Sequence, residues 1–199
     1  MERVSPGEGV IGQLDAQAVN AMIGVMEQLH QASIPQKELP TVIQWGAGFH
    51  RLRKMFGGGT GPLPASLVQE AEDVFRNLVS SMGPAVLLHG DLHHMNILSA
   101  GERSWLAIDP KGVIGERAYE IGAFLRNPMP NLLEWPDLEV RQRQRIIEFS
   151  KRTGIQEKRI SGWGFSQAVL SAIWSIEDHG RGWEISIRVA KGLRNLAFT

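Results

Sequence analysis

The residues best suited to chemistry lie in one short loop between apolar segments. Residues 89–96 read HGDLHHMN, which places a carboxylate, Asp91, five residues before an amide, Asn96; a second carboxylate, Asp109, follows thirteen residues later. Phosphoryl transfer uses such a set, because one Asp orients a hydroxyl nucleophile while an Asn and an Asp bind magnesium. We therefore predict Asp91 as the catalytic, base-like residue, and Asn96 and Asp109 as oxygen ligands of Mg²⁺.

The same loop matches a known catalytic pattern. The protein-kinase catalytic loop reads H-R-D-L-x-x-x-N, and this chain has its His, Asp, Leu and Asn, with Gly90 in place of the Arg. A turn held by Asx hydrogen bonds would explain Asp91 or Asn96 alone, but not the pair followed by Asp109 after an apolar run. For His89 we predict a bracing role, in which its hydrogen bonds hold the loop in place.

Other polar residues allow further interpretations. Zinc is not expected, because the spacing of His89, His93 and His94 fits no common zinc site and the chain has no cysteine. We instead expect His94 to lie near the phosphate or the substrate. Glu177 and Asp178 end a long predicted helix, where the helix dipole disfavours acidic side chains. They are therefore candidates for binding a cationic or hydroxyl-rich substrate.

Composition limits the kinds of function that the chain can have. Its 199 residues are enough for one domain with a sizeable core, and its 43% apolar and 21% charged content is ordinary for a globular protein. Lys plus Arg equal Asp plus Glu, at 21 each, so we expect no binding to nucleic acid or to an anionic membrane. The first residues do not resemble a secretion signal, and no apolar run is long enough to cross a bilayer. We expect a cytoplasmic protein.

The elements that must position the loop are mostly helical. Apolar residues at helical spacing predict helices over 15–33, 42–56, 64–82, 117–126, 138–153, 156–178 and 185–198, and short apolar runs predict strands at 85–88, 96–99 and 105–108. Asp15 and Asp137 are predicted N-caps. The glycine-rich run 57–61 joins two helices, so we interpret it as a connector and not as a phosphate-binding loop. The expected fold is mainly α (α+β), with helices around a small β-hairpin sheet that carries the 89–96 loop.

Several motifs together resemble one enzyme family. HGDLHHMNIL at 89–98, AIDPKGVIGERAYEIG at 107–122, LRNP at 125–128 and WSIED at 174–178 are similar to the aminoglycoside phosphotransferase family, in its streptomycin 6-kinase (aminoglycoside/hydroxyurea antibiotic resistance kinase) branch. The resemblance implies a protein-kinase-like fold, ATP and Mg²⁺ as cofactors, and γ-phosphate transfer to a hydroxyl of an aminoglycoside-like small molecule. By position it makes Asp91 catalytic, Asn96 and Asp109 metal ligands, and Glu120 an acidic residue that steadies the loop.

The resemblance also implies a division of the protein into lobes. Residues 1–14 resemble the hinge between the two lobes of this family, and no β-rich segment with a nucleotide-covering loop and its lysine is found in the sequence. We therefore expect one domain, 1–199, equivalent to the C-terminal lobe. Apolar surface that faces the other lobe would favour self-association. Two alternatives stay open: a non-catalytic remnant that binds a ligand or partner, and a kinase of another small hydroxylated metabolite.

Overall fold

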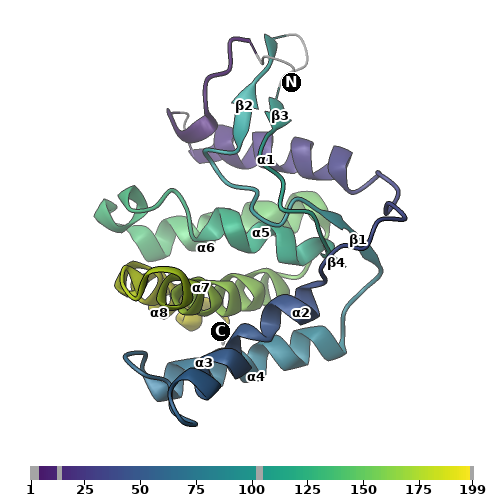
Figure 1. Cartoon of the computed structure of the whole chain (residues 1–199). Helices are drawn as coiled ribbons and strands as arrows, with labels where there is room; N and C mark the ends of the chain where they lie inside the picture. Colours follow the sequence, from purple (N-terminus) through teal and green to yellow (C-terminus); the bar gives the residue numbers. More distant parts are fainter. Residues whose placement is uncertain (1–4, 13–14, 102–104, 198–199) are drawn as a thin grey trace.

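Helices form most of the described chain, which comprises residues 5–12, 15–101 and 105–197 of this computed structural model (Figure 1). The helices are α1 (Asp15–Leu29), α2 (Val42–Gly46), α3 (Gly48–Met55), α4 (Ala65–Ser80), α5 (Arg117–Leu125), α6 (Leu138–Thr153), α7 (Glu157–His179) and α8 (Trp183–Ala197), with short 3₁₀ helices at Val10–Gly12 and Asn131–Glu134. None of the described helices combines the length and the apolar character needed to cross a bilayer.

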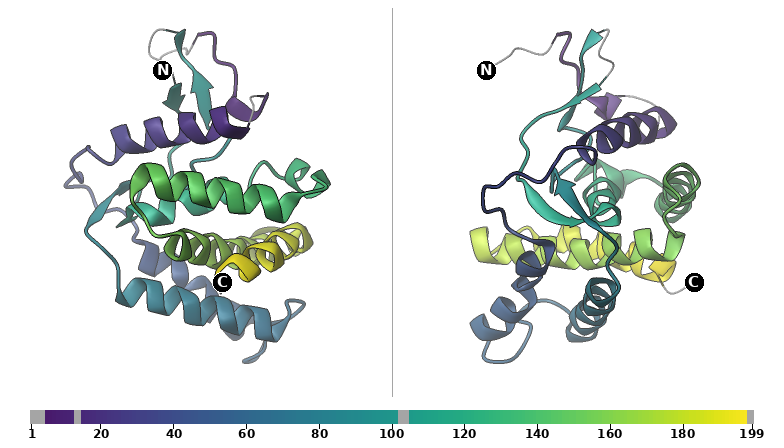
Figure 2. Two further views of the ribbon diagram at one scale, coloured as in Figure 1. Left: turned by 180° about the vertical axis from the view of Figure 1, so that it is seen from behind. Right: turned by 90° about the vertical axis from the view of Figure 1, so that its right-hand side faces the viewer.

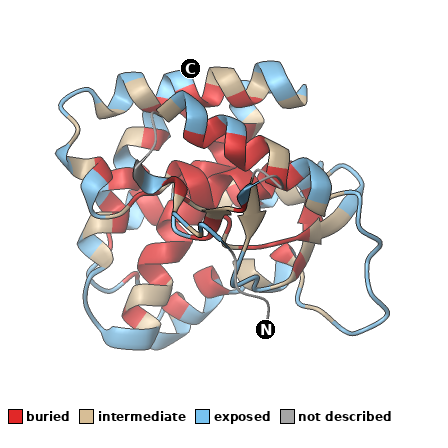
Figure 3. Cartoon of the chain, turned by 90° about the horizontal axis from the view of Figure 1, so that it is seen from above, coloured by how far each residue is buried: buried red, intermediate tan, exposed pale blue. Residues whose placement is uncertain are grey.

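The long helix α7 lies at the centre of the molecule. It packs against α8 most extensively, and then against α5 and α4, so that the helices stack in layers with α1 and α4 on opposite sides (Figure 2). Every residue from Ile160 to Ile173 is buried. The buried residues of the chain gather in the middle of the molecule (Figure 3). A helix that is apolar on all sides must be enclosed by other elements. The core therefore forms around α7, and the polar loop lies at its edge.

Four short strands form two separate antiparallel sheets. β1 (Ala85–Leu88) pairs with β4 (Val113–Glu116), and β2 (Ile97–Ser99) pairs with β3 (Trp105–Ala107). The 89–96 loop runs from β1 to β2, and the segment 108–112 runs from β3 back to β4. Both segments therefore cross between the same two sheets, which brings them side by side although they are distant in sequence.

The structure corrects several local predictions. The first helix ends at Leu29 and not near Ser33, and the predicted helix after Thr41 is two helices, α2 and α3, separated at Ala47. β4 was not predicted, and the strand at 85–88 pairs with it instead of joining the β2–β3 hairpin. The hairpin sheet therefore carries only one end of the loop.

The two predicted aspartate caps had different outcomes: the position of Asp137 is confirmed and that of Asp15 is wrong. Asp15 is the first residue of α1, and its carboxylate accepts hydrogen bonds from the buried Arg145 side chain, with Nε to Oδ1 at 2.9 Å. Asp137 is the N-cap residue of α6, as predicted, but its side chain makes no capping bond; its Oδ1 instead accepts from Nε of Arg141 at 2.9 Å. In both cases the carboxylate accepts a charged hydrogen bond from a guanidinium instead of a bond from a backbone N–H at the start of the helix.

Candidate active site

The start of the loop is fixed by one buried carboxylate. Glu120, in the first turn of α5, accepts the backbone N–H of His89 at 2.6 Å and that of Gly90 at 2.9 Å. Gly90 has φ +86°, and a Cβ at this position would lie 2.7 Å from the Trp45 ring. Only glycine is free of strain at such a φ, and no side chain fits. This explains why glycine replaces the arginine of the kinase pattern.

His89 connects the two segments that cross between the sheets. Its Nδ1 accepts the backbone N–H of Asp91 at 3.3 Å, so its Nε2 carries the proton and donates to the carbonyl of Ile108 at 2.8 Å. The backbone carbonyl of His89 accepts from the N–H groups of Lys111 at 2.9 Å and Gly112 at 3.1 Å. The loop and the segment 108–112 are thus held together by both the side chain and the backbone of His89.

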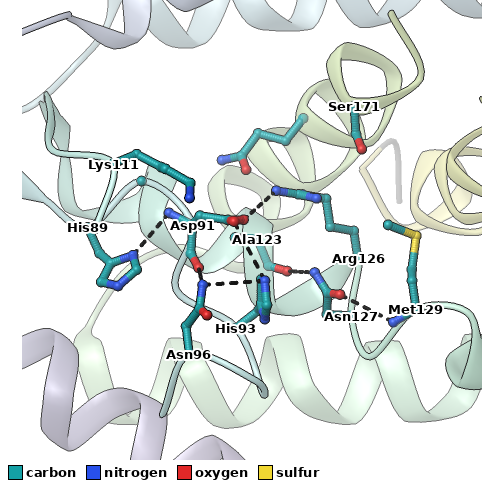
Figure 4. Close-up of polar contacts among 12 residues, drawn as sticks. His89, Asp91, His93, Asn96, Lys111, Ala123, Arg126, Asn127, Met129 and Ser171 are labelled. Carbon is teal, nitrogen blue, oxygen red and sulfur yellow. Dashed lines mark hydrogen bonds and ion pairs between the residues drawn. The ribbon is translucent and has the colours of Figure 1, made fainter. Parts of the chain in front are cut away.

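The Asp91 carboxylate faces cationic and imidazole groups (Figure 4). Its Oδ1 lies 3.0 Å from Nη2 of Arg126, and its Oδ2 lies 3.6 Å from Nε2 of His93. Burial alone would raise the pKa of Asp91, but His93 and the positive charges of Arg126 and Lys111 outweigh it and lower this pKa to about 2. Asp91 is therefore ionised at neutral pH.

The predicted metal ligands lie on the same two segments. Nδ2 of Asn96 donates to the backbone carbonyl of Asp91 at 2.9 Å, which leaves the amide oxygen without a hydrogen-bond donor among the described residues. Asp109 has a left-handed φ of +56°, and its Oδ2 lies 2.7 Å from Nζ of Lys111. The described residues contain no group of three His, Asp or Glu side chains arranged around a metal position. A bound ion would need Asn96 and Asp109 together with oxygens from water or a phosphate.

A cavity of about 540 Å³ opens beside Asp91. Aromatic and charged side chains from α2, α3, α5, α7 and the two crossing segments surround it: Gln44, Trp45, Arg51, Gly90, Asp91, Lys111, Arg126, Trp174 and Asp178. Trp45 and Trp174 meet edge to face, with ring centroids 5.8 Å apart. The cavity is large enough for part of a small-molecule acceptor and places it against the ionised Asp91.

The three predicted substrate residues lie in different environments. Asp178 lines the cavity and is exposed. Glu177 forms a two-bond ion pair with Arg51, at 2.7 and 3.0 Å, and so holds that cavity residue in place. His94 does not line the cavity: its ring is buried, stacks on Phe124 with centroids 4.0 Å apart, and lies 3.2 Å from Nη2 of Arg145. Burial and then the charge of Arg145 lower the pKa of His94 to about 2.

Sequence reasoning missed the cations and aromatic rings of the cavity. Arg126 lies in the LRNP motif, yet nothing in its local pattern indicates that it would pair with Asp91, 35 residues earlier. Arg51, Trp45 and Trp174 come from helices whose apolar periodicity signals burial and not a ligand. Only their arrangement in the folded chain identifies them.

Comparison with known proteins places the chain in a family. A family model described as aminoglycoside/hydroxyurea antibiotic resistance kinase matches residues 1–179. The chain belongs to this family. Its curated relatives include a streptomycin 3''-kinase of Klebsiella pneumoniae, 32% identical over 186 residues, and a streptomycin 6-kinase of Streptomyces glaucescens, 24% identical over 191 residues. These alignments cover 89% and 90% of this chain, but 66% and 59% of the relatives, so the chain spans about two thirds or less of their length.

Solved structures confirm the expected fold of this family member. A thermostable mutant of aminoglycoside phosphotransferase APH(4)-Ia, in ternary complex with ADP and hygromycin B, has a TM-score of 0.67 at 13% identity and covers 96% of this chain and 68% of its own. A choline/ethanolamine kinase family protein from Mesorhizobium loti has a TM-score of 0.71 at 14% identity, with coverage of 100% and 70%. The predicted kinase-like, mainly helical architecture is therefore confirmed.

Proposed function

We propose that the chain is the catalytic lobe of an ATP-dependent kinase that phosphorylates a hydroxyl group of an aminoglycoside, streptomycin-like, or of a related small molecule. The observation that carries the proposal is the ionised Asp91 carboxylate at the wall of a 540 Å³ cavity, with cationic side chains around it. The printed names of the relatives, streptomycin kinases and a hydroxyurea phosphotransferase from Kitasatospora aureofaciens, support the reaction class.

In this proposal, each residue of the loop has a separate task. Asp91 accepts a hydrogen bond from the acceptor hydroxyl and takes its proton as the hydroxyl oxygen bonds to the γ-phosphorus. The bond between the γ-phosphorus and the bridging oxygen of ATP breaks, and ADP leaves with the electron pair. His89 and Glu120 do not touch the substrate. They brace the loop through the hydrogen bonds described above, so that Asp91 stays in line with the phosphorus.

The donor set near the loop fits magnesium. We assign Asn96 and Asp109 as its protein ligands, because an amide oxygen and a carboxylate are hard donors and Mg²⁺ usually takes only one or two carboxylates, with phosphates and water completing its coordination. The ion would neutralise charge on the triphosphate. Its binding to Asp109 would also compete with Lys111, which is free to turn because its side chain is 46% exposed.

The acceptor would occupy the cavity wall that α7 forms. Asp178 is exposed there and has no hydrogen-bond or ion-pair partner among the described residues, so it suits an ammonium or guanidinium group of an aminoglycoside. Trp174 offers an aromatic face or edge next to it. Glu177 contributes indirectly, because its ion pair positions Arg51. His94 packs behind the loop and does not contact the acceptor.

We further propose that residues 1–199 are one domain, with 1–14 as the hinge to a nucleotide-covering lobe, in a cytoplasmic protein. The described part of the hinge is attached to β2, because Gly7 N–H donates to the Ser99 carbonyl at 3.0 Å and Ser99 N–H donates to the Glu8 carbonyl at 2.8 Å. Residues 1–4 and 13–14 lie outside the described residues. Exposed apolar side chains beside the site, Met95 and Ile108, support self-association through this face.

A transfer assay tests the function. The purified chain is incubated with Mg²⁺, ATP and streptomycin, and phosphorylated drug and ADP are measured. We expect equal amounts of both, and an at least about hundredfold lower rate for Asp91→Asn, because a positioned base contributes on that order. Asp137→Asn, which changes a surface ion pair with Arg141, is the matched control and should transfer at the normal rate. No transfer, together with no nucleotide-dependent thermal shift, would favour the non-catalytic alternative.

A further inference from the structure

Arg126 is held rigidly at the end of α5 and directed at the reaction site. Its backbone N–H donates to the Gly122 carbonyl at 3.3 Å at the C-terminus of the helix. The next residue, Asn127, is buried; it donates to the Ala123 carbonyl at 2.8 Å and accepts the N–H of Met129 at 3.2 Å (Figure 4). The Arg126 side chain is only 12% exposed and reaches Oδ1 of Asp91 with Nη2 at 3.0 Å.

The guanidinium has more donors than Asp91 uses. An arginine has five N–H donors, and here one of its nitrogens, Nη2, contacts one carboxylate oxygen. Nε is buried without a partner, so it is sealed from the cavity. Nη1 has no hydrogen-bond partner among the described residues, and Arg126 lines the cavity. The guanidinium therefore keeps terminal N–H donors that no described residue uses, at the cavity wall beside the Asp91 carboxylate.

The two other cations of the cavity are already engaged. Arg51 binds Glu177 through two hydrogen bonds and is 47% exposed. Lys111 binds Asp109 and is nearly as exposed. Water and salt screen exposed charges more strongly than buried ones. Of the three, Arg126 is the least screened and lies closest to the carboxylate that must approach an anionic phosphate.

We propose that Arg126 is a catalytic residue that bridges Asp91 and the phosphoryl group being transferred. Nη2 fixes Oδ1 of Asp91, so the acceptor hydroxyl uses Oδ2, which lies 3.6 Å from Nε2 of His93, while the remaining terminal N–H donors of Arg126 bind oxygens of the phosphoryl group. The guanidinium thereby offsets the repulsion between the carboxylate and the phosphate and stabilises the charge of the transition state. The inference rests on the proposed function, because it needs a γ-phosphate in this cavity.

Nucleotide binding tests this role without relying on turnover. Calorimetric Kd values for ADP and for the non-hydrolysable AMP-PNP, each with Mg²⁺, are compared in the parent chain, Arg126→Gln and Arg126→Lys. We expect Arg126→Gln to weaken AMP-PNP binding by about tenfold or more, as for loss of a charged hydrogen bond, and to change ADP binding by less than about twofold. Arg126→Lys should recover part of the loss, because it keeps the charge but not the planar fork.

Activity and a matched control complete the test. Arg194→Gln, which removes an exposed ion pair with Glu70, should behave as the parent does. Transfer by Arg126→Ala should rise when guanidinium chloride is added at low millimolar concentration, an effect that a purely structural arginine would not show. Equal weakening of ADP and AMP-PNP, or parent-like binding and rate in Arg126→Gln, would overturn the inference while leaving the kinase function intact. If the parent binds neither nucleotide, the proposed function fails and the role of Arg126 falls with it.

Discussion

At the scale of single residues, hydrogen bonds and close packing restrict which side chains fit around the 89–96 loop. Glu120 holds two backbone N–H groups, His89 joins the loop to the segment 108–112, and Gly90 lies against Trp45. None of these three residues reaches the cavity with a reactive atom. They limit the freedom of Asp91, and a kinase that works mainly by positioning depends on such limits.

The structure predicts an unusually large cost for a side chain at position 90. Gly90→Ala must keep φ at +86° and place Cβ 2.7 Å from Trp45. Gly57→Ala is the matched control, since Gly57 also has a positive φ, +59°, but its Cβ would meet open space. We expect Gly57→Ala to lower the free energy of unfolding by about 1 kcal/mol and Gly90→Ala to lower it by about 1–3 kcal/mol more. Urea unfolding measures both changes. Equal destabilisation by the two substitutions would show that the Trp45 ring moves aside without an energetic cost.

The residues that sequence reasoning identified and those that it missed differ in one physical respect. Spacing along the chain is enough to indicate Asp91, Asn96 and Asp109 as candidates. Arg126 could not be indicated in this way, because it reaches Asp91 only after α5 has packed beside the loop. Pairings of this kind depend on tertiary contacts, which a local pattern does not record.

At the scale of elements, most helices were predictable because their apolar residues recur at helical spacing. The misses occurred where tertiary contacts decided the outcome. β4 reads VIGE, too short and too mixed to signal a strand, and it forms because β1 pairs with it over four residues. The break between α2 and α3 has no proline to announce it. Thr41 does start α2, through a capping box with Gln44, as the pattern of Thr followed by Gln allows.

The packing of the loop on α5 and α6 predicts an acid sensitivity. His94 is buried between Phe124 and Arg145, with its pKa lowered from 6.5 to about 2. Because the unfolded chain binds this proton below pH 6.5 and the folded chain does not, stability is complete above pH 6.5 and falls as the pH drops. Below pH 6.5, the titration of His94 should lower the free energy of unfolding by about 1.4 kcal/mol for each pH unit.

Urea unfolding between pH 4.5 and 6.5 isolates this contribution. The pKa of Asp91 falls from 3.8 in the unfolded chain to about 2, so the stability that it adds is lost only below this window. His94→Phe keeps a buried ring that can stack on Phe124 and should reduce the pH slope by about one proton, whatever its effect on stability at pH 7. The exposed His179→Phe is the control and should keep the parent slope. A parent-like slope in His94→Phe would contradict the assignment.

At the scale of the whole molecule, the 89–96 loop and the helices α2, α3 and α7 meet at one cavity. The predicted fold class is confirmed by the solved relatives, and the chain covers 68% and 70% of two of them. Motifs across most of the chain made this predictable, since they fix the order of loop, strand and helix. The shape of the cavity was not predictable, because α2, α3 and α7 meet there from three distant parts of the sequence.

The proposed self-association gives a prediction at this scale. Met95 is 61% exposed and Ile108 is 36% exposed, and each directly precedes one of the metal-ligand candidates, Asn96 and Asp109. If this face joins two copies, the parent should show a concentration-dependent dimer in sedimentation velocity, and Met95→Gln should shift the equilibrium toward monomer by about tenfold, through lost apolar burial. Val140→Gln, at an equally exposed apolar residue on α6, is the control. If the parent stays monomeric at every concentration, this interface is ruled out.

The cavity is lined by two separate sets of elements, and this separation affects how such a protein can change over evolution. In the proposed function, the two segments that cross between the sheets carry the groups assigned to the phosphate, whereas α2, α3 and α7 contribute Trp45, Arg51 and Trp174 to the cavity wall. On that proposal, substitutions in these helices would change which acceptor molecules fit the cavity and leave the groups assigned to the phosphate unchanged. A change of acceptor would then need only a few helix substitutions and no change in the residues that carry out the transfer.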